Sequence, residues 1–263
     1  ETKEEEEEIV STPSSVPRKI SIHQLVDAER AQSIPAVLQK TPALINSRNK
    51  EGYTPLHTAS LKGLDNCVEI LLEIGGQQSP KIEVDARDST GWTPLHCASL
   101  NGHTNCVEIL IKNQADVNAV TTNGSTALHY AASWGRIDCM KVLVDAGCKI
   151  DHRSTYSGQT ALHVATSKGY THCVNYLLQQ GANVIEVDTR GRSSLDIAKI
   201  EAHEDIADML IEYKRMVPWY KQWKAFLCCQ GSGDLYSVLP ATQTKPERVR
   251  EPGALPSRDI SLL

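Results

Sequence analysis

The residues best suited to chemistry in this chain of 263 residues are its eight cysteines and nine histidines. Thiolates and imidazoles act as nucleophiles and as zinc ligands, and paired thiols can form disulfides. Four cysteines and four histidines recur at regular distances, so the first question is whether they form a repeated reactive site. The recurring residues are Cys67, Cys106, Cys139 and Cys173, with His57, His96, His129 and His163.

Each recurring histidine is the fourth residue of a short motif. The motif reads TPLHTAS at 54–60, TPLHCAS at 93–99, TALHYAA at 126–132 and TALHVAT at 160–166, and its last copy is SSLDIAK at 193–199. Successive copies begin 39, 33, 34 and 33 residues apart. A fixed period of this length is typical of a stacked repeat array. The spacing therefore predicts one structural unit used many times rather than five active sites.

The motif contains the residues that begin and end a helix. Thr54 is a good N-cap, Pro55 suits the first helical position, and Gly63 can end the helix in the left-handed conformation. A second helix with apolar residues at helical spacing follows. A glycine two residues before each motif, such as Gly52, predicts a tight turn between helix pairs.

Both ends of the array have degenerate copies of the unit. Residues 21–53 fit the period, with Arg30 in the position of the helix-ending glycine. In the last copy, Asp196 replaces the histidine and Ala202 replaces the glycine. Acidic residues there are expected to give the terminal repeat a water-facing outer surface. They are Glu201, Glu204, Asp205 and Asp208.

Two intervals are longer than the period. The 39-residue interval has six extra residues around 75–81, which we expect in the loop after the second helix of that unit. The 34-residue interval has one extra residue near 154–158, which we expect at a hairpin tip.

The motif and its period resemble those of the ankyrin-repeat family over roughly residues 21–215. The resemblance implies an all-α solenoid of about six helix-pair units joined by β-hairpin turns. The expected repeats are about 21–53, 54–92, 93–125, 126–159, 160–192 and 193–215. A flexible acidic tail is expected at 1–20 and a disordered tail at 230–263.

The recurring cysteines occupy one slot of the unit, which holds Ile34 and Ile206 in the end copies. A slot that accepts either residue is a small apolar site in the core. Neighbouring repeats should stack about 10 Å apart, whereas a disulfide needs Cα atoms within about 7 Å. We therefore expect reduced, buried thiols, without metal or cofactor. For the histidines, the resemblance implies hydrogen bonds to loop backbone.

No motif of an enzyme stands out, and we predict that the chain is not one. With 27 basic and 32 acidic residues, it lacks the basic surface that binds nucleic acid. It contains no long apolar run. The localisation that we expect is cytoplasmic, with a membrane surface and the nucleus as alternatives.

Residues 216–229 contain three aromatic residues at helical spacing, followed by Cys228 and Cys229. One interpretation is an aromatic amphipathic helix that packs on the last repeat. The other is a helix at the membrane interface, with the two cysteines as acylation sites. The final residues resemble a PDZ ligand or an acidic dileucine sorting signal. These residues are Asp259, Ser261, Leu262 and Leu263.

The resemblance favours a non-catalytic scaffold or adaptor that binds proteins through a concave face. The alternative is a recruiter that is tethered to a membrane through residues 219–229. In the family, recognition side chains lie just before the motif and at the seventh and eighth positions after its start. The residues predicted to bind a partner are Tyr53, Leu61, Trp92, Leu100 and Trp134. Alternatively, Trp92 and Trp134 only pack on neighbouring hairpins. In that case the insertion at 75–81 is the next candidate for the partner-binding surface.

Ankyrin repeats are also known as substrates of an asparaginyl hydroxylase. The preferred context is a Leu eight residues before an Asn that ends a DVN sequence, and Leu110 with residues 116–118 matches it. The resemblance thus makes Asn118 a candidate hydroxylation site. The alternative is that Asn118 hydrogen-bonds the turn.

Overall fold

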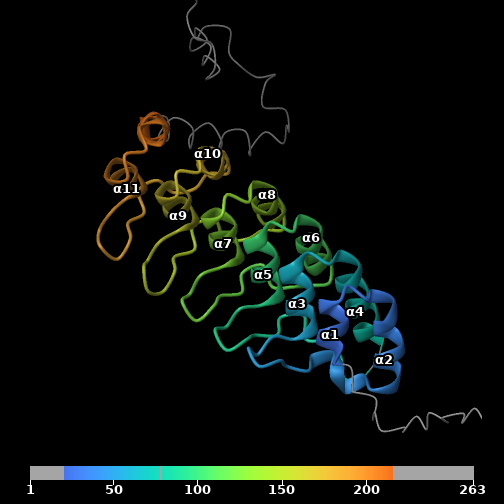
Figure 1. The fold of residues 1–263 in the computed structure, drawn as a ribbon. Helices are drawn as coiled ribbons and strands as arrows, with labels where there is room; N and C mark the ends of the chain where they lie inside the picture. Colours follow the sequence, from blue (N-terminus) through green and yellow to red (C-terminus); the bar gives the residue numbers. More distant parts are fainter. Residues whose placement is uncertain (1–20, 78, 216–263) are drawn as a thin grey trace, which may run out of the picture. The chain divides into compact units, whose positions relative to one another are not determined.

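The computed structural model describes residues 21–77 and 79–215, and these fold into helices joined by loops (Figure 1). The acidic tail predicted at 1–20, and the helix and tail predicted at 216–229 and 230–263, lie outside the described residues. Short 3₁₀ turns lie at Ala31–Ser33 and Pro42–Asn46. The α-helices are α1 (Ile22–Asp27), α2 (Ile34–Lys40), α3 (Pro55–Lys62), α4 (Asp65–Gln77), α5 (Pro94–Asn101), α6 (Thr104–Lys112), α7 (Ala127–Ser133), α8 (Ile137–Asp145), α9 (Ala161–Ser167), α10 (Thr171–Gln179) and α11 (Ser194–Ile200), and residues 204–215 form a further helix.

The helices stack in two rows. Helices α1, α3, α5, α7, α9 and α11 pack in succession as the inner row, and α2, α4, α6, α8 and α10 pack as the outer row. Figure 1 shows the loops between units projecting together from one side of the helix pairs. The described residues therefore form six helix pairs, which confirms the predicted all-α repeat solenoid.

The first helix of each unit begins and ends as its motif predicts. The Thr54 side chain accepts a hydrogen bond from the His57 N–H at the start of α3, where Pro55 occupies the first turn. Gly63 ends α3 with φ 70°, a conformation that costs glycine no steric strain. Ala202, in the glycine position of the last unit, has φ 57°. In the first unit the left-handed residue is Glu29 (φ 56°) and not Arg30, because α1 ends one residue earlier than expected.

The loops are hairpins, but they are less β-like than expected. Each is closed by a main-chain hydrogen bond, such as that from the Asp88 N–H to the Trp92 oxygen at 3.0 Å. Within 21–77 and 79–215, the one β-bridge joins Val187 to Ser193. Neighbouring tips are joined as well: the Thr155 N–H donates to the Asn123 oxygen at 2.9 Å.

The insertion around 75–81 forms less loop than predicted. Helix α4 has 13 residues whereas its equivalent α6 has nine, so four of the six extra residues lengthen the helix. Gly75 lies buried in this added turn, and a Cβ at that position would overlap Ile82 and approach the Ile45 side chain to 2.7 Å. This position of the helix holds a glycine because the neighbouring side chains leave no room for a larger residue.

The last repeat has a mixed outer surface. The four acidic residues expected there are all exposed. However, Ile200 in this repeat is also 61% exposed, and Ile185 and Val187 at the end of the repeat before it are 65% and 39% exposed. The end of the array is therefore less polar than predicted.

Candidate functional site

Each motif histidine links the first helix of its repeat to the hairpin loop that leads into the next repeat. The Thr54 N–H donates to Nδ1 of His57 at 3.2 Å, which leaves Nε2 to donate to the main-chain oxygen of Trp92 at 3.0 Å. The other three histidines reach the following loop in the same way, at 3.0 to 3.3 Å. Their partners are the main-chain oxygens of Ser125, Gln159 and Glu186.

Burial keeps these histidines neutral. It lowers the pKa of His96 and the pKa of His129 to about 4, and it lowers the pKa values of His57 and His163 as well. Because both ring nitrogens are already hydrogen-bonded, no lone pair is available for a metal or a substrate proton. These geometries agree with the structural role that the resemblance implied.

The recurring cysteines lie in the core, with at most 2% of their surface exposed. All six cysteines of the described residues are free thiols. Cys106 donates its thiol hydrogen to Oδ1 of Asp65 at 2.9 Å, and burial raises the pKa of Cys173 to about 11. A thiol that resists ionisation is a poor nucleophile and a poor metal ligand. Within the described residues, no group of His, Cys, Asp and Glu is arranged to hold a metal ion.

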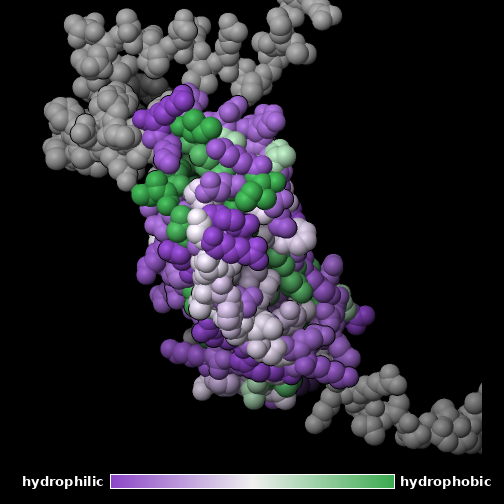
Figure 2. Space-filling model, turned by 90° about the vertical axis from the view of Figure 1, so that its left-hand side faces the viewer, coloured by the Kyte–Doolittle hydropathy of each residue, from purple (hydrophilic) through white to green (hydrophobic). Residues whose placement is uncertain are grey.

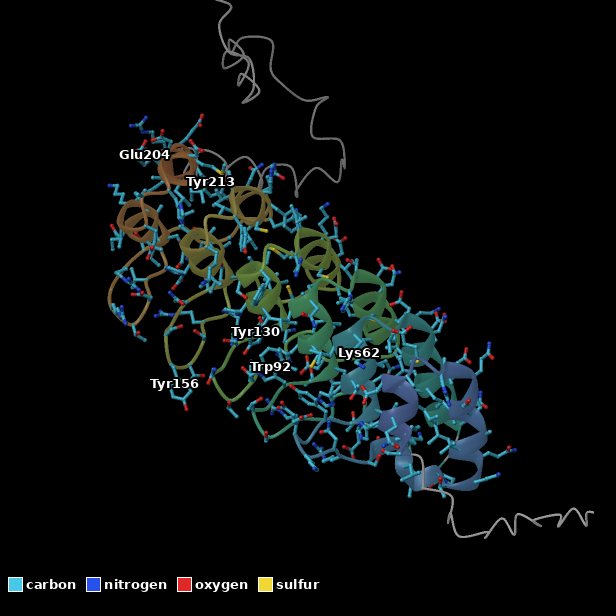
Figure 3. The ribbon with its side chains drawn as sticks, in the orientation of Figure 1. Lys62, Trp92, Tyr130, Tyr156, Glu204 and Tyr213 are labelled. Atoms are coloured by element: carbon cyan, nitrogen blue, oxygen red, sulfur yellow. The ribbon has the colours of Figure 1, made fainter. Side chains whose placement is uncertain are left out.

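The predicted partner-binding residues differ in how much of each side chain is exposed. Trp134, at the end of α7, is 55% exposed. Trp92 is half-buried and packs on Tyr130 of the next repeat, with ring centroids 4.3 Å apart and planes inclined by 45°. Figure 3 shows the Trp92 and Tyr130 side chains together on the loop side of the inner helices. Tyr53 stacks on His57 at 5.6 Å, and Leu61 and Leu100 are half-buried.

Two aromatic residues on this side were missed from the sequence. Tyr130 extends the Trp92 contact, and Tyr156 is 73% exposed near a hairpin tip (Figure 3). Tyr156 lies in the hairpin with the extra residue, whose closing hydrogen bond joins Ser154 to Gln159 at 2.9 Å. The insertion was itself a signal, because a longer tip projects its side chains further.

Asn118 joins two repeats rather than only its own turn. Its Oδ1 accepts a hydrogen bond from the Lys149 N–H at 2.8 Å. Asn46 and Asp85 form the same contact in earlier repeats, accepting from Glu83 and Asp116 at 3.0 Å. Hydroxylation of Asn118 stays a prediction.

The remaining predicted sites lie outside the described residues. They are Cys228, Cys229, Asp259, Ser261, Leu262 and Leu263, and the helix expected at 216–229 lies there too. Among the helices that the structure describes, none is long and apolar enough to cross a membrane.

Models of known protein families match most of this chain. Residues 79–154 and 150–218 match a family model described as ankyrin repeats (3 copies). Residues 37–82 match a second model, described as ankyrin repeats (many copies). A search of curated proteins finds no match.

Proposed function

The chain belongs to the ankyrin-repeat family, whose members are in general protein–protein interaction modules, and from this premise we propose that it is a non-catalytic scaffold or adaptor. It binds its partner through the face formed by the inner helices and the hairpin loops. The buried, fully hydrogen-bonded histidines and protonated thiols support a structural use of the residues that could otherwise do chemistry.

The single observation that carries the proposal is the exposure of Trp134. A tryptophan that is 55% exposed leaves a large apolar surface in water, and tryptophan leads the residues that dominate binding energies. Trp92 and Tyr130 add a half-buried aromatic pair on the loop side of the inner helices. Together they resemble the aromatic anchors of protein interfaces.

The test is affinity purification from cell extract with the full chain as bait, followed by mass spectrometry. Trp134→Ala should weaken binding of the partner by about 2 kcal/mol or more, as hot-spot truncations do. Lys168→Ala is the matched control, because Lys168 occupies the same position one repeat later. It should leave binding nearly unchanged.

Thermal melting separates binding from folding in this test. Trp134→Ala should melt like the parent, because its side chain is mostly exposed. Trp92→Ala should lower both binding and melting temperature, because it also loses the contact with Tyr130. If Trp134→Ala captures the parent's partner unchanged, the binding surface lies elsewhere.

The membrane-tethered recruiter remains the alternative. Palmitate labelling and membrane fractionation of the full chain, with and without Cys228 and Cys229, would test it. Labelling that is lost in the double Cys→Ala variant would favour the tethered form, in which the repeats still recruit protein partners. A cytoplasmic location, and binding of the C-terminal residues to a PDZ domain or a sorting adaptor, are further proposals.

A further inference from the structure

The middle of the proposed binding face has no charged side chain. The eight residues at the recognition positions between 92 and 167 are all uncharged, and Lys168 is the first charge after them. The hairpin tips at 89–90, 122–123 and 155–157 are uncharged as well. We call these positions, together with Tyr130, the uncharged lane. Figure 2 shows a pale strip of intermediate hydropathy on the loop side, between hydrophilic flanks.

The charged side chains beside the lane hydrogen-bond other protein groups or lie at its ends. Asp88 accepts from the Trp92 N–H at 2.7 Å, and Arg136 donates to the main-chain oxygen of Leu100 at 3.3 Å. Arg153 donates to the main-chain oxygen of Val187 at 2.7 Å and lies 3.5 Å from the Glu186 carboxylate. Arg87 donates to the main-chain oxygen of Val120 in the next repeat. Beyond the N-terminal end of the lane, Lys62 pairs with Asp27 at 2.8 Å.

The lane contains groups that could hydrogen-bond an extended chain. Asn123 is exposed and Gln159 is half-buried. Within the part of the chain that the structure describes, neither amide side chain forms a hydrogen bond. A primary amide both donates and accepts, so the two residues match the N–H and C=O groups of peptide backbone. Trp92, Tyr130 and Trp134 supply aromatic surface for apolar side chains.

We propose that the lane binds an uncharged, extended polypeptide segment with aliphatic or proline side chains. This inference rests on the proposed function and specifies its partner. A charged side chain bound there would lose water, and no side chain of the lane itself supplies a counter-charge, which costs free energy. Aromatic stacking and amide hydrogen bonds need no charge, so binding should depend little on salt.

The probe is a random-peptide phage library selected on the purified full chain. The enriched peptides should lack net charge, and their Kd should change less than about twofold between about 0.05 and 0.5 M NaCl. Gln159→Glu, which adds a charge to the lane at nearly constant shape, should weaken them by at least about fivefold. Gln179→Glu is the matched control, because Gln179 is exposed on the outer helix α10. It should leave Kd unchanged.

The outcomes separate the two proposals. Trp134-dependent peptides that are mainly charged, and that weaken about tenfold in high salt, would overturn the uncharged partner but keep the binding face. Peptides that bind Trp134→Ala as well as the parent would overturn the binding face and the lane together. A selection with no enriched peptide would also count against both.

Discussion

The inner repeats and the last repeat follow one sequence plan but face different surroundings. In the repeat that begins at Thr93, the histidine bonds the next loop, and the glycine of the hairpin lies against the next hairpin. In the last repeat, Asp196 replaces the histidine and caps its own helix through Ser193. Ile185 occupies the position from which Asn118 bonds the following repeat. Within the described residues, Asp196 and Ile185 thus do not form the contacts that His96 and Asn118 form with the loop or repeat that follows them.

This difference identifies the structural roles of the repeated motif. A motif with a histidine caps its own helix and also bonds the loop that leads into the next repeat. Stability in such an array is approximately a sum of unit and interface terms. Substitutions at equivalent positions should therefore cost more inside the array than at its end.

The largest expected effect is a loss of folding stability at acidic pH. The pKa values of His96 and His129, about 4 in the fold, lie below the usual value near 6.5 for the unfolded chain. The unfolded state therefore binds more protons between these values, and stability falls as the pH falls from about 6.5 towards 4. At pH 5 each of the two histidines should cost on the order of 2 kcal/mol. Urea unfolding at pH 7 and pH 5 measures the sum.

The last repeat should respond in a lower pH range. Hydrogen bonds from the Ser193 side chain and main chain lower the pKa of Asp196. Its stabilising contribution is therefore kept above its ordinary value of 3.8 and is lost only below it. His96→Gln should remove part of the loss between pH 7 and 5. Equal urea midpoints at the two pH values would contradict the neutral, buried state of these histidines.

A matched pair of glycines tests the junctions directly. Gly124 and Gly191 both have φ 74°, so alanine should add about 1–2 kcal/mol of left-handed strain at either site. At Gly124 the new Cβ would also overlap the main-chain nitrogen of Thr155 in the next hairpin, whereas no heavy atom of the described residues lies within 4 Å at Gly191. We expect Gly124→Ala to cost about 3 kcal/mol in total and Gly191→Ala about half as much. Equal losses in chemical denaturation would show that the stacked hairpin can move aside.

A smaller contrast lies at the positions of Asn118 and Ile185. Asn118→Ala removes the acceptor of the Lys149 N–H, which should cost about 1 kcal/mol because water can replace part of this half-buried contact. Ile185→Asn should change stability by less than about 0.5 kcal/mol, because the Ile185 side chain is 65% exposed. Thermal melts of the two variants give the comparison. A larger loss for Ile185→Asn would mean that its exposed side chain is covered in the full chain.

The sequence predicted the parts of the fold that repeat. The burial of the recurring cysteines and the left-handed conformation of Gly63 could be predicted, because several repeats have the same residue type at the same position. The Trp92–Tyr130 contact could not be predicted, because it joins different positions of two repeats and no other motif has an aromatic residue at the position of Tyr130. The added turn of α4 was hidden because Gly75 usually signals a loop, whereas here it makes room for Ile82.

A small gain in stability is expected from one substitution inside the array. Ser99 in α5 is fully buried, and its hydroxyl forms no hydrogen bond with the described residues. The equivalent residue of the next repeat is Ala132, also fully buried, so the site accepts a methyl group. Ser99→Ala should raise the free energy of unfolding by about 0.5–1 kcal/mol, because it removes an unpaired buried hydroxyl and favours the helix. Ser133→Ala is the control: the Ser133 hydroxyl donates to the Tyr130 oxygen at 2.9 Å, and its loss should bring no gain. If Ser99→Ala instead lowers the melting temperature, a bound water pairs this hydroxyl in solution.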